Sequence, residues 1–253
     1  MPKQAGIFKI TGTMDDVSFF KTSDGFMVRK KTGVNGARIK SDPAFQRTRE
    51  NLAEFTRAGK AGALLRRTVK TNLGIRFDKR AGNRLVAAMF RVLQTDRSPR
   101  GERTVVRGNA ELLKDFEFNA NATLAGTLSV KCKGQIDRTT GTMTVPVPSF
   151  VPGRAVARPE GSTHLKLVMA ALGVDFETSD TESATASSEP IEVALASELP
   201  PVTLSASVTP ASSRPLFLIF GVEFYQELDG RMYPIKNGAF NALTILQVDD
   251  SAD

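Results

Sequence analysis

Alternation of apolar and polar residues dominates the first thirty positions of the chain. It occurs in three short runs, GIFKITG (6–12), DVSFFKT (16–22) and GFMVRKK (25–31). A period of two is typical of strands that have one covered face. The turn-forming sequences TMDD and TSDG separate the runs. The pattern therefore predicts a three-stranded antiparallel meander, which needs a helix or another chain against one face to be stable.

A helical pattern follows the meander. Asp42 and Pro43 form a typical helix start, and apolar residues continue at helical spacing. We expect Gly59 and Gly74 to end a first and a second helix, and Asp78 to begin a third. Because the intervening loops are short, the three helices are predicted to pack as neighbours.

Short strand-like runs return after the polar joint TDRSPRGE (95–102). Their regular spacing predicts an antiparallel β-sandwich of immunoglobulin-like or jelly-roll type, with a barrel as the alternative. The chain has no Trp and one Cys, so it lacks the Trp and the disulfide of antibody domains. The predicted strands are 126–134, 141–150, 163–178, 191–196, 202–208, 215–228 and 241–248.

Three polar segments connect these runs. The sequences DRTTG (137–141) and LDGRMYPIKNG (228–238) have the composition of hairpin connections. The acidic, Ser/Thr-rich segment 177–190 has the composition of a linker between domains. Strand-like runs on both of its sides favour a long exposed loop within the sandwich instead.

These elements predict an α+β, mainly β chain in two parts. Residues 1–104 would form a basic module of β-meander and helices, and residues 105–253 a β-sandwich domain. The charge follows a similar division, because residues 1–108 hold 24 Lys and Arg and 9 Asp and Glu, whereas residues 109–253 hold 10 and 18. This asymmetry is compatible with a polyanion-binding part, with two surfaces that attract each other, or with two solvated faces.

The composition excludes several classes of protein. The apolar runs, such as PLFLIFGV (215–222), are too short for a bilayer-spanning helix, and the N-terminus has no signal-peptide core. A single cysteine excludes an intramolecular disulfide and fits a reducing compartment. We therefore expect a cytoplasmic protein with no membrane span.

Catalytic signatures are missing from the sequence. His164 is the one histidine and Cys132 the one cysteine, so a zinc site built from several His and Cys cannot form within one chain. No nucleophile elbow, Walker A loop or Rossmann fingerprint is present. We predict a protein that is not an enzyme, with no catalytic, cofactor-binding or metal-binding residues, no cofactor and no small-molecule substrate.

Basic residues on the predicted helices are the candidates for partner binding. In the first hypothesis they dock on the acidic sandwich of another copy, and the protein is structural and forms a homo-oligomer or a filament. In the alternative, the basic helices at 43–91 bind nucleic acid, although no helix-turn-helix, zinc-finger or RNA-recognition signature appears. The candidate residues are Arg47, Arg49, Arg57, Arg66, Arg67, Lys70, Arg84 and Arg91.

About the first 75 residues combine several short motifs. A G-x-x-K-x-x-G segment precedes an aromatic-Lys pair, an Asp-Gly turn, an Arg and the motif D-P-x-F-x-R-T-R-E-N-x-x-E-F. These features lie at Gly6 to Gly12, Phe20 and Lys21, Asp24 and Gly25, Arg29, and residues 42–55. The combination resembles an uncharacterised family of bacterial proteins. The resemblance implies a shared packing or docking module and carries over no activity.

Overall fold

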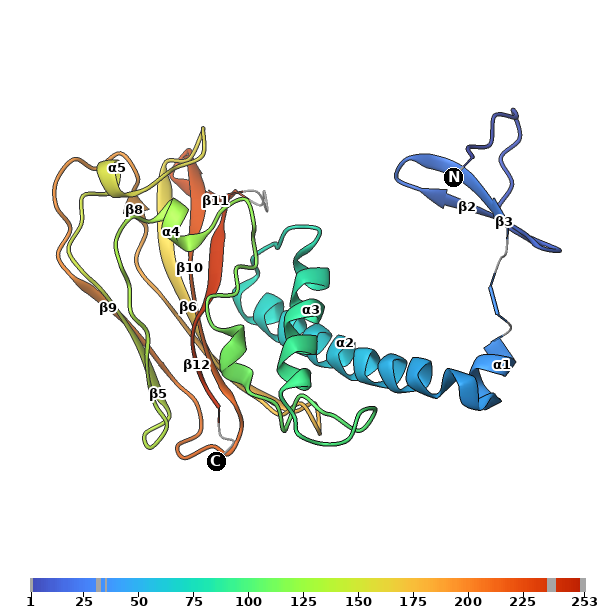
Figure 1. Cartoon of the computed structure of the whole chain (residues 1–253). Coiled ribbons are helices and arrows are strands. Elements are labelled where there is room, and N and C mark those ends of the chain that lie inside the picture. Colours follow the sequence, from blue (N-terminus) through green and yellow to red (C-terminus); the bar gives the residue numbers. More distant parts are fainter. Residues whose placement is uncertain (1, 31–32, 35, 236–239, 251–253) are drawn as a thin grey trace. The chain divides into compact units, whose positions relative to one another are not determined.

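The computed structural model describes residues 2–30, 33–34, 36–235 and 240–250 (Figure 1). The chain divides into two compact units, Met1–Arg49 and Glu50–Asp253. This division differs from the predicted parts 1–104 and 105–253. The physical reason is that most of the helical segment shares a hydrophobic core with the β-rich part of the chain.

The first unit contains the predicted antiparallel meander, in the order β1-β2-β3. Its strands are β1 (Gly12–Met14), β2 (Val17–Thr22) and β3 (Gly25–Lys30). The prediction of a first strand at 6–12 is wrong. Residues 2–4 instead pair with β3, through Gln4 N to Phe26 O (2.9 Å) and Val28 N to Pro2 O (3.0 Å), so the chain must turn back before β1.

Helix α1 (Gly36–Ser41) and the 3₁₀ helix η1 (Pro43–Phe45) lead into α2 (Gln46–Leu73). Asp42 caps as predicted, because its carboxylate accepts a hydrogen bond from the Ala44 amide. Gly59 does not end a helix, since α2 continues for 28 residues. The helix ends before Gly74, whose φ of +68° is the left-handed conformation typical of a C-terminal glycine.

Helix α3 (Ala81–Gln94) follows a short loop. The Asp78 carboxylate accepts a hydrogen bond from the Arg80 amide just before the helix begins. Gly62 of α2 lies close to Val86 of α3, where an added Cβ would be 3.4 Å from Val86 Cγ2. Small residues therefore let the two helices approach closely.

Two antiparallel sheets form the rest of the second unit. In the larger, six-stranded sheet the order is β11-β10-β6-β7, with β12 also paired to β10 and β8 to β6. The smaller sheet has the order β4-β5-β9. The bounds are β4 (Gln135–Asp137), β5 (Thr142–Val147), β6 (His164–Val174), β7 (Thr181–Ser187), β8 (Ile191–Glu192), β9 (Val202–Ser207), β10 (Leu216–Leu228), β11 (Arg231–Pro234) and β12 (Ala242–Asp249). The short helices η2 (Ala110–Leu113), α4 (Leu124–Thr127) and α5 (Pro152–Ala155) lie in the connections.

The second unit has three layers, with the six-stranded sheet between the smaller sheet and helices α2 and α3 (Figure 1). Alternation along β6 shows this directly. Leu167 and Met169 pack in the core with β5 and β9, whereas Val168 and Ala170 pack with the helices. Both faces of β6 are therefore buried, which explains its nearly continuous apolar sequence. The chain is α+β and mainly β as predicted, and the packed sheets are consistent with a sandwich.

One predicted strand and one predicted loop are wrong. Segment 126–134 contains the end of α4 and irregular chain instead of a strand. Segment 177–190 is not a long loop, because it contains β7, which pairs with β6 through Ala184 opposite Ala171. The hairpin at 137–141 is confirmed by the pairing of β4 with β5. The predicted loop 228–238 begins with the β10–β11 turn, and its residues 236–238 lie outside the described residues.

Candidate functional site

A groove of about 630 Å³ runs between α2 and the start of α3. Small residues, such as Gly59, Gly62 and Gly82, line much of it. The guanidinium group of Arg66 lies across the α3 backbone, where an added Cβ on Gly82 would be 3.7 Å from Arg66 Nε. Because these positions have no side chain, the groove stays open although the helices are close together.

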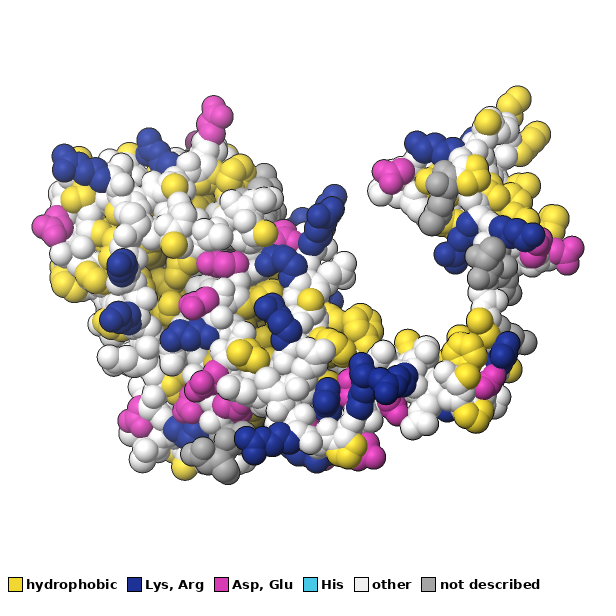
Figure 2. Space-filling model, viewed as in Figure 1, with side chains coloured by type: hydrophobic (Ala, Val, Ile, Leu, Met, Phe, Trp, Pro, Cys, Tyr) yellow, Lys and Arg dark blue, Asp and Glu magenta, His cyan; other side chains and the backbone are white. Residues whose placement is uncertain are grey.

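Four cationic side chains line this groove, namely Arg66 and Lys70 of α2, and Arg76 and Lys79 of the α2–α3 loop. All four are exposed. Within the described part of the chain, none of their side chains forms an ion pair or a hydrogen bond. Figure 2 shows Lys and Arg side chains over the surface of α2 and α3. The groove is therefore cationic and its charges are not neutralised by those residues.

One carboxylate, that of Asp78, lines the groove, and it is already engaged. Burial acts to raise the pKa of Asp78, but hydrogen bonds from the Ala120 and Arg80 amides and from Arg84 outweigh it and lower that pKa. Arg84 also forms an ion pair with Asp78. The negative charge is thus balanced by Arg84 and leaves the four groove cations unpaired.

Three of the eight predicted partner-binding residues form hydrogen bonds within their own chain. Arg49 donates to the carbonyls of Ile39 and Asp42, both at 2.8 Å. Arg57 donates a hydrogen bond to the backbone carbonyl of Gly101, and Arg84 donates one to the backbone carbonyl of Glu117. Such hydrogen bonds fix the guanidinium groups, so these residues are poor candidates for gripping a partner.

The other five predicted residues are exposed. Arg66 and Lys70 line the groove, whereas Arg47, Arg67 and Arg91 do not. Arg76 and Lys79 were not among the predicted residues, because those were cations within predicted helices and these two lie in a loop. The available signal was that both lie within two residues of Asp78, where the third helix was predicted to begin.

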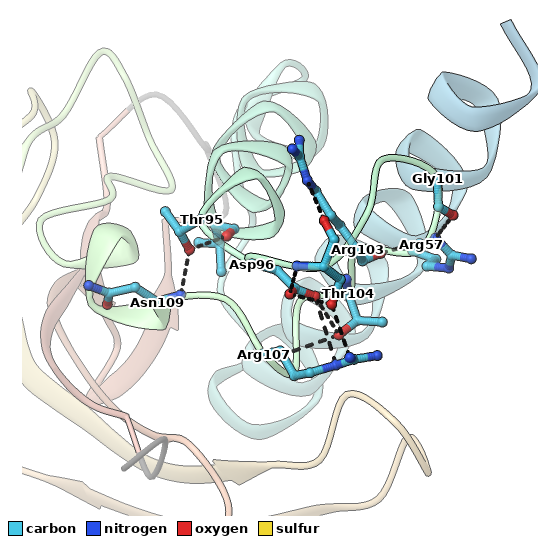
Figure 3. A network of polar contacts seen from close by, with 10 residues as sticks. Arg57, Thr95, Asp96, Gly101, Arg103, Thr104, Arg107 and Asn109 are labelled. Carbon is cyan, nitrogen blue, oxygen red and sulfur yellow. Dashed lines mark hydrogen bonds and ion pairs between the residues drawn. The ribbon is translucent and has the colours of Figure 1, made fainter. Parts of the chain in front are cut away.

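A polar network around Asp96 fixes the loop that follows α3 (Figure 3). The buried Asp96 carboxylate accepts from the Ser98 amide (2.8 Å) and the Thr104 amide (2.8 Å). Burial opposes ionisation, but these hydrogen bonds and Arg107 lower the pKa of Asp96 to about 2. In the same loop, Arg57 donates to the carbonyl of Gly101 (2.6 Å). The network therefore anchors the loop to α2 and has the character of a structural site.

Glu117 and Arg84 form a second polar contact at the edge of the helical layer. Arg84 donates to the backbone carbonyl of Glu117 (2.7 Å), and Glu117 Oε1 accepts from the Leu124 amide (3.0 Å). The Oε2 atom of Glu117 is buried, and it has no hydrogen-bond partner among the residues that the structure describes. Burial raises the pKa of Glu117 to about 7, against the opposing effect of the Leu124 amide, and the charge of Asp115 adds to the rise.

Replacing Glu117 by glutamine is expected to remove a pH-dependent loss of stability. A carboxyl group whose pKa is raised in the folded state favours folding when protonated, so its contribution is lost as pH rises from about 4.5 to about 7. After allowance for partial exposure, Glu117→Gln should stabilise the protein by about 1–2 kcal/mol at pH 8 and change little at pH 4. Urea unfolding at both pH values measures this.

The Asp115→Asn variant provides the control, because it removes the nearby charge and keeps Glu117. It should make the loss of stability above pH 4.5 smaller and end that loss at a lower pH, because removing the charge of Asp115 lowers the raised pKa of Glu117 in part. Equal stabilisation by Glu117→Gln at pH 4 and pH 8 would show that packing, and not titration, is responsible.

The meander of the first unit has one mainly apolar face and one mixed face, and the mixed face carries the paired Phe20 and Met27. Paired residues share a face. Lys21 and Lys30 lie on the same face as Phe26 and Val17, with which they pair. The apolar residues of this face are Met14, Val17, Phe19, Phe26 and Val28. We call these five residues the apolar sheet face. On the opposite face the Arg29 guanidinium covers the Phe20 ring at 5.2 Å, and the Thr13 and Ser18 hydroxyls are 3.3 Å apart.

No described residue of the first unit is buried. Met14 of the apolar sheet face is 65% exposed, and Phe8, in the segment before β1, is 88% exposed. A sheet of this size gains its stability from a covered face. The structure thus identifies a second candidate site, an apolar surface that the described residues leave without a core.

The two residues considered for catalysis do not form a catalytic arrangement with each other. His164 Nδ1 lies 3.0 Å from the Thr163 hydroxyl and 3.7 Å from Glu227 Oε2. Burial raises the pKa of the Cys132 thiol to about 11, so it is protonated and poorly nucleophilic at neutral pH.

The described residues provide no cluster of metal ligands, and comparison with known proteins gives no match. Within residues 2–30, 33–34, 36–235 and 240–250, no group of three His, Cys, Asp or Glu side chains is placed to hold a metal ion. In the same ranges, no helix has the length and apolar character needed to cross a bilayer. No family model, curated protein or solved structure matches the chain. The resemblance of the N-terminal motifs to a bacterial family therefore stays a prediction.

Proposed function

We propose that the protein is a non-enzymatic structural subunit that assembles with copies of itself through its N-terminal module. The observation that supports this is the absence of any buried residue among the described residues of the first unit. A module that holds five apolar residues on one sheet face, and buries none of them, gains stability when another chain covers that face.

The size of the apolar sheet face indicates what else the contact needs. Strands of three, six and six residues, about 4.8 Å apart, present roughly 240 Å² of surface on one face. A stable interface buries about 800 Å² on each partner. The sheet face alone is therefore too small, and the contact must include further surface, for which Ile7 and Phe8 are available because both are almost fully exposed.

Charge complementarity favours a second copy as the partner. Residues 1–49 hold 10 Lys and Arg and 4 Asp and Glu, whereas residues 109–253 hold 10 and 18. The basic module of one copy can thus dock on the acidic part of the next. A contact between unlike surfaces is heterologous, so it produces rings or open filaments. The homo-oligomer or filament predicted from the sequence is retained as part of this proposal.

The test measures mass against protein concentration. Light scattering coupled to gel filtration should show a mass that rises above that of one chain across about a hundredfold range of concentration. Negative-stain electron microscopy of the same samples should show rings or filaments. A monodisperse monomer throughout the range would contradict the proposal.

Two lysine substitutions in β1 give a matched pair. Met14→Lys places a charge in the apolar sheet face and should reduce the assembled fraction at least tenfold, because a buried unpaired ammonium is costly. Thr13→Lys adds the same charge to the neighbouring exposed residue on the opposite face. It should leave assembly within about twofold of the unmodified protein. Equal effects of the two variants would show that net charge, and not the sheet face, controls assembly.

A cytoplasmic location belongs to this proposal as well. The single cysteine, which is half-buried and protonated at neutral pH, is compatible with a reducing compartment. The proposed role needs no cofactor and no small-molecule substrate.

A further inference from the structure

The groove between α2 and α3 is a separate candidate for binding, and it is independent of self-assembly. We propose that this groove binds the phosphodiester backbone of duplex nucleic acid without reading its sequence. This narrows the nucleic-acid hypothesis for residues 43–91 to four residues, Arg66, Lys70, Arg76 and Lys79, two of which lie outside the helices.

The cations of the groove are arranged so that an anion can reach all four. Two cations come from one helix and two from the following loop, so they line the groove from different elements. The single lining carboxylate, Asp78, is held by Arg84 and by two backbone amides. An anion that enters the groove therefore meets four cations without first displacing an acidic side chain from any of them.

The exposure of these cations favours a polymeric anion over a small one. All four are exposed, and an exposed ion pair contributes little by itself because water and salt screen it. Sites for small ligands instead bury most of the ligand and present a few desolvated polar groups. A polymer with regularly spaced phosphates can neutralise several exposed cations at once and release its condensed counterions. The open, solvated groove favours such a polymer over a free phosphate or nucleotide.

The aromatic content of the groove distinguishes duplex from single-stranded nucleic acid. Proteins that bind single strands without sequence preference stack bases on exposed aromatic rings. Phe77 is the aromatic residue among the groove-lining residues, and its ring packs on Phe118 with centroids 4.8 Å apart. Because this ring is engaged in the core, the residues that line the groove offer no free aromatic ring for base stacking. Such a surface suits the backbone of a duplex.

The test uses the full chain and a short fluorescent DNA duplex of arbitrary sequence. Anisotropy titrations at several salt concentrations should give a slope of log affinity against log salt of roughly −3 to −4, as expected for four phosphate contacts. A second duplex of unrelated sequence should bind with the same affinity within about threefold. No binding at low salt, or a flat response to salt, would overturn the proposal.

Two double variants with equal charge give the decisive comparison. Arg66→Gln with Lys70→Gln should weaken binding at least tenfold and make the slope shallower by about 2. The control, Arg67→Gln with Arg91→Gln, removes two exposed cations of the same helices that do not line the groove. It should weaken binding by less than about threefold. Equal losses in both variants would show that net charge alone attracts the DNA.

A steric variant tests the groove without changing its charge. At Gly59 an added Cβ meets nothing within 4 Å, and the residue lies within α2, where leucine is a better helix former than glycine. Gly59→Leu should therefore fold normally, fill part of the groove and weaken duplex binding at least tenfold. Unchanged binding by this variant would place the DNA elsewhere on the surface.

Competitors and the assembly assay separate the remaining alternatives. A single strand of the same length should bind less tightly, and tighter binding would overturn the duplex assignment. Inorganic triphosphate should compete only at concentrations that act through ionic strength, and stoichiometric competition would indicate a small-anion site. The Arg66→Gln/Lys70→Gln variant should keep its assembly state. Loss of assembly without loss of duplex binding would assign the groove to a neighbouring subunit.

Discussion

Replacing Gly141 by alanine is expected to lower the free energy of unfolding by about 3 kcal/mol. Gly141 ends the hairpin loop before β5 and has a φ of +71°, a conformation that costs alanine about 1–2 kcal/mol. An added Cβ would also lie 2.3 Å from the carbonyl oxygen of Val208, which is backbone and cannot rotate away. Because the Val208 amide donates to the Gly141 carbonyl, the substitution disturbs the neighbouring β5–β9 pairing.

Gly230→Ala is the matched control for this prediction. Gly230 lies in the β10–β11 turn with a φ of +73°, so it has the same backbone strain. However, an added Cβ there meets nothing within 4 Å. We expect a loss of about 1 kcal/mol, from strain alone. Urea denaturation of both variants measures the difference, and equal losses would show that the contact with Val208 relaxes at no cost.

The second large effect is expected at Asp96. Asp96→Ala should lower the free energy of unfolding by about 3 kcal/mol at pH 7, because it leaves several donors of the loop without their buried acceptor. These include the Ser98 and Thr104 amides. The buried carboxylate of Glu54, which is 2% exposed, holds the same loop through the Gly101 amide, so the loop should loosen without detaching completely.

Acid provides an internal check on this role. A carboxyl group with a lowered pKa stabilises the folded state above its unfolded pKa, and that stabilisation is lost as pH falls from about 3.8 to about 2. The difference between the unmodified protein and Asp96→Ala should therefore shrink across this range. Asp137→Ala is the control, because Asp137 accepts similar hydrogen bonds in an exposed turn, and its loss of stability should be much smaller than that of Asp96→Ala. A difference for Asp96→Ala that does not change with pH would show that its charge is unimportant.

The two proposals make independent demands on the molecule. Self-assembly depends on the apolar sheet face of the first unit, whereas duplex binding depends on cations of the second unit. Met14→Lys should therefore reduce assembly and leave duplex binding unchanged, whereas the groove variants should weaken duplex binding and leave assembly unchanged. Either proposal can fail without affecting the other.

Local sequence signals predicted the elements whose causes are local. The Asp42 cap, the glycine at 74 and the Asp-Gly turn of the meander all act within a few residues, and the structure confirms them. Gly59 was misread because a glycine ends a helix only where the backbone turns left-handed, and packing of α2 on the core keeps it helical. Strand β7 was missed because its Ser and Thr residues have the composition of a loop. It is a strand because it pairs with β6, which lies in another part of the sequence.

The sequence by itself determined the α+β class, the meander, most strands and the excess of positive charge in the first part of the chain. Only the tertiary structure decided that α2 and α3 cover the six-stranded sheet, that Arg49, Arg57 and Arg84 hold their own chain, and that Arg66, Lys70, Arg76 and Lys79 share one groove. The physical reason is the separation along the chain of the residues that interact. Caps, turns and alternation depend on neighbouring residues, whereas the partner of an arginine is set by the packing of segments far apart in the chain, which no local pattern encodes.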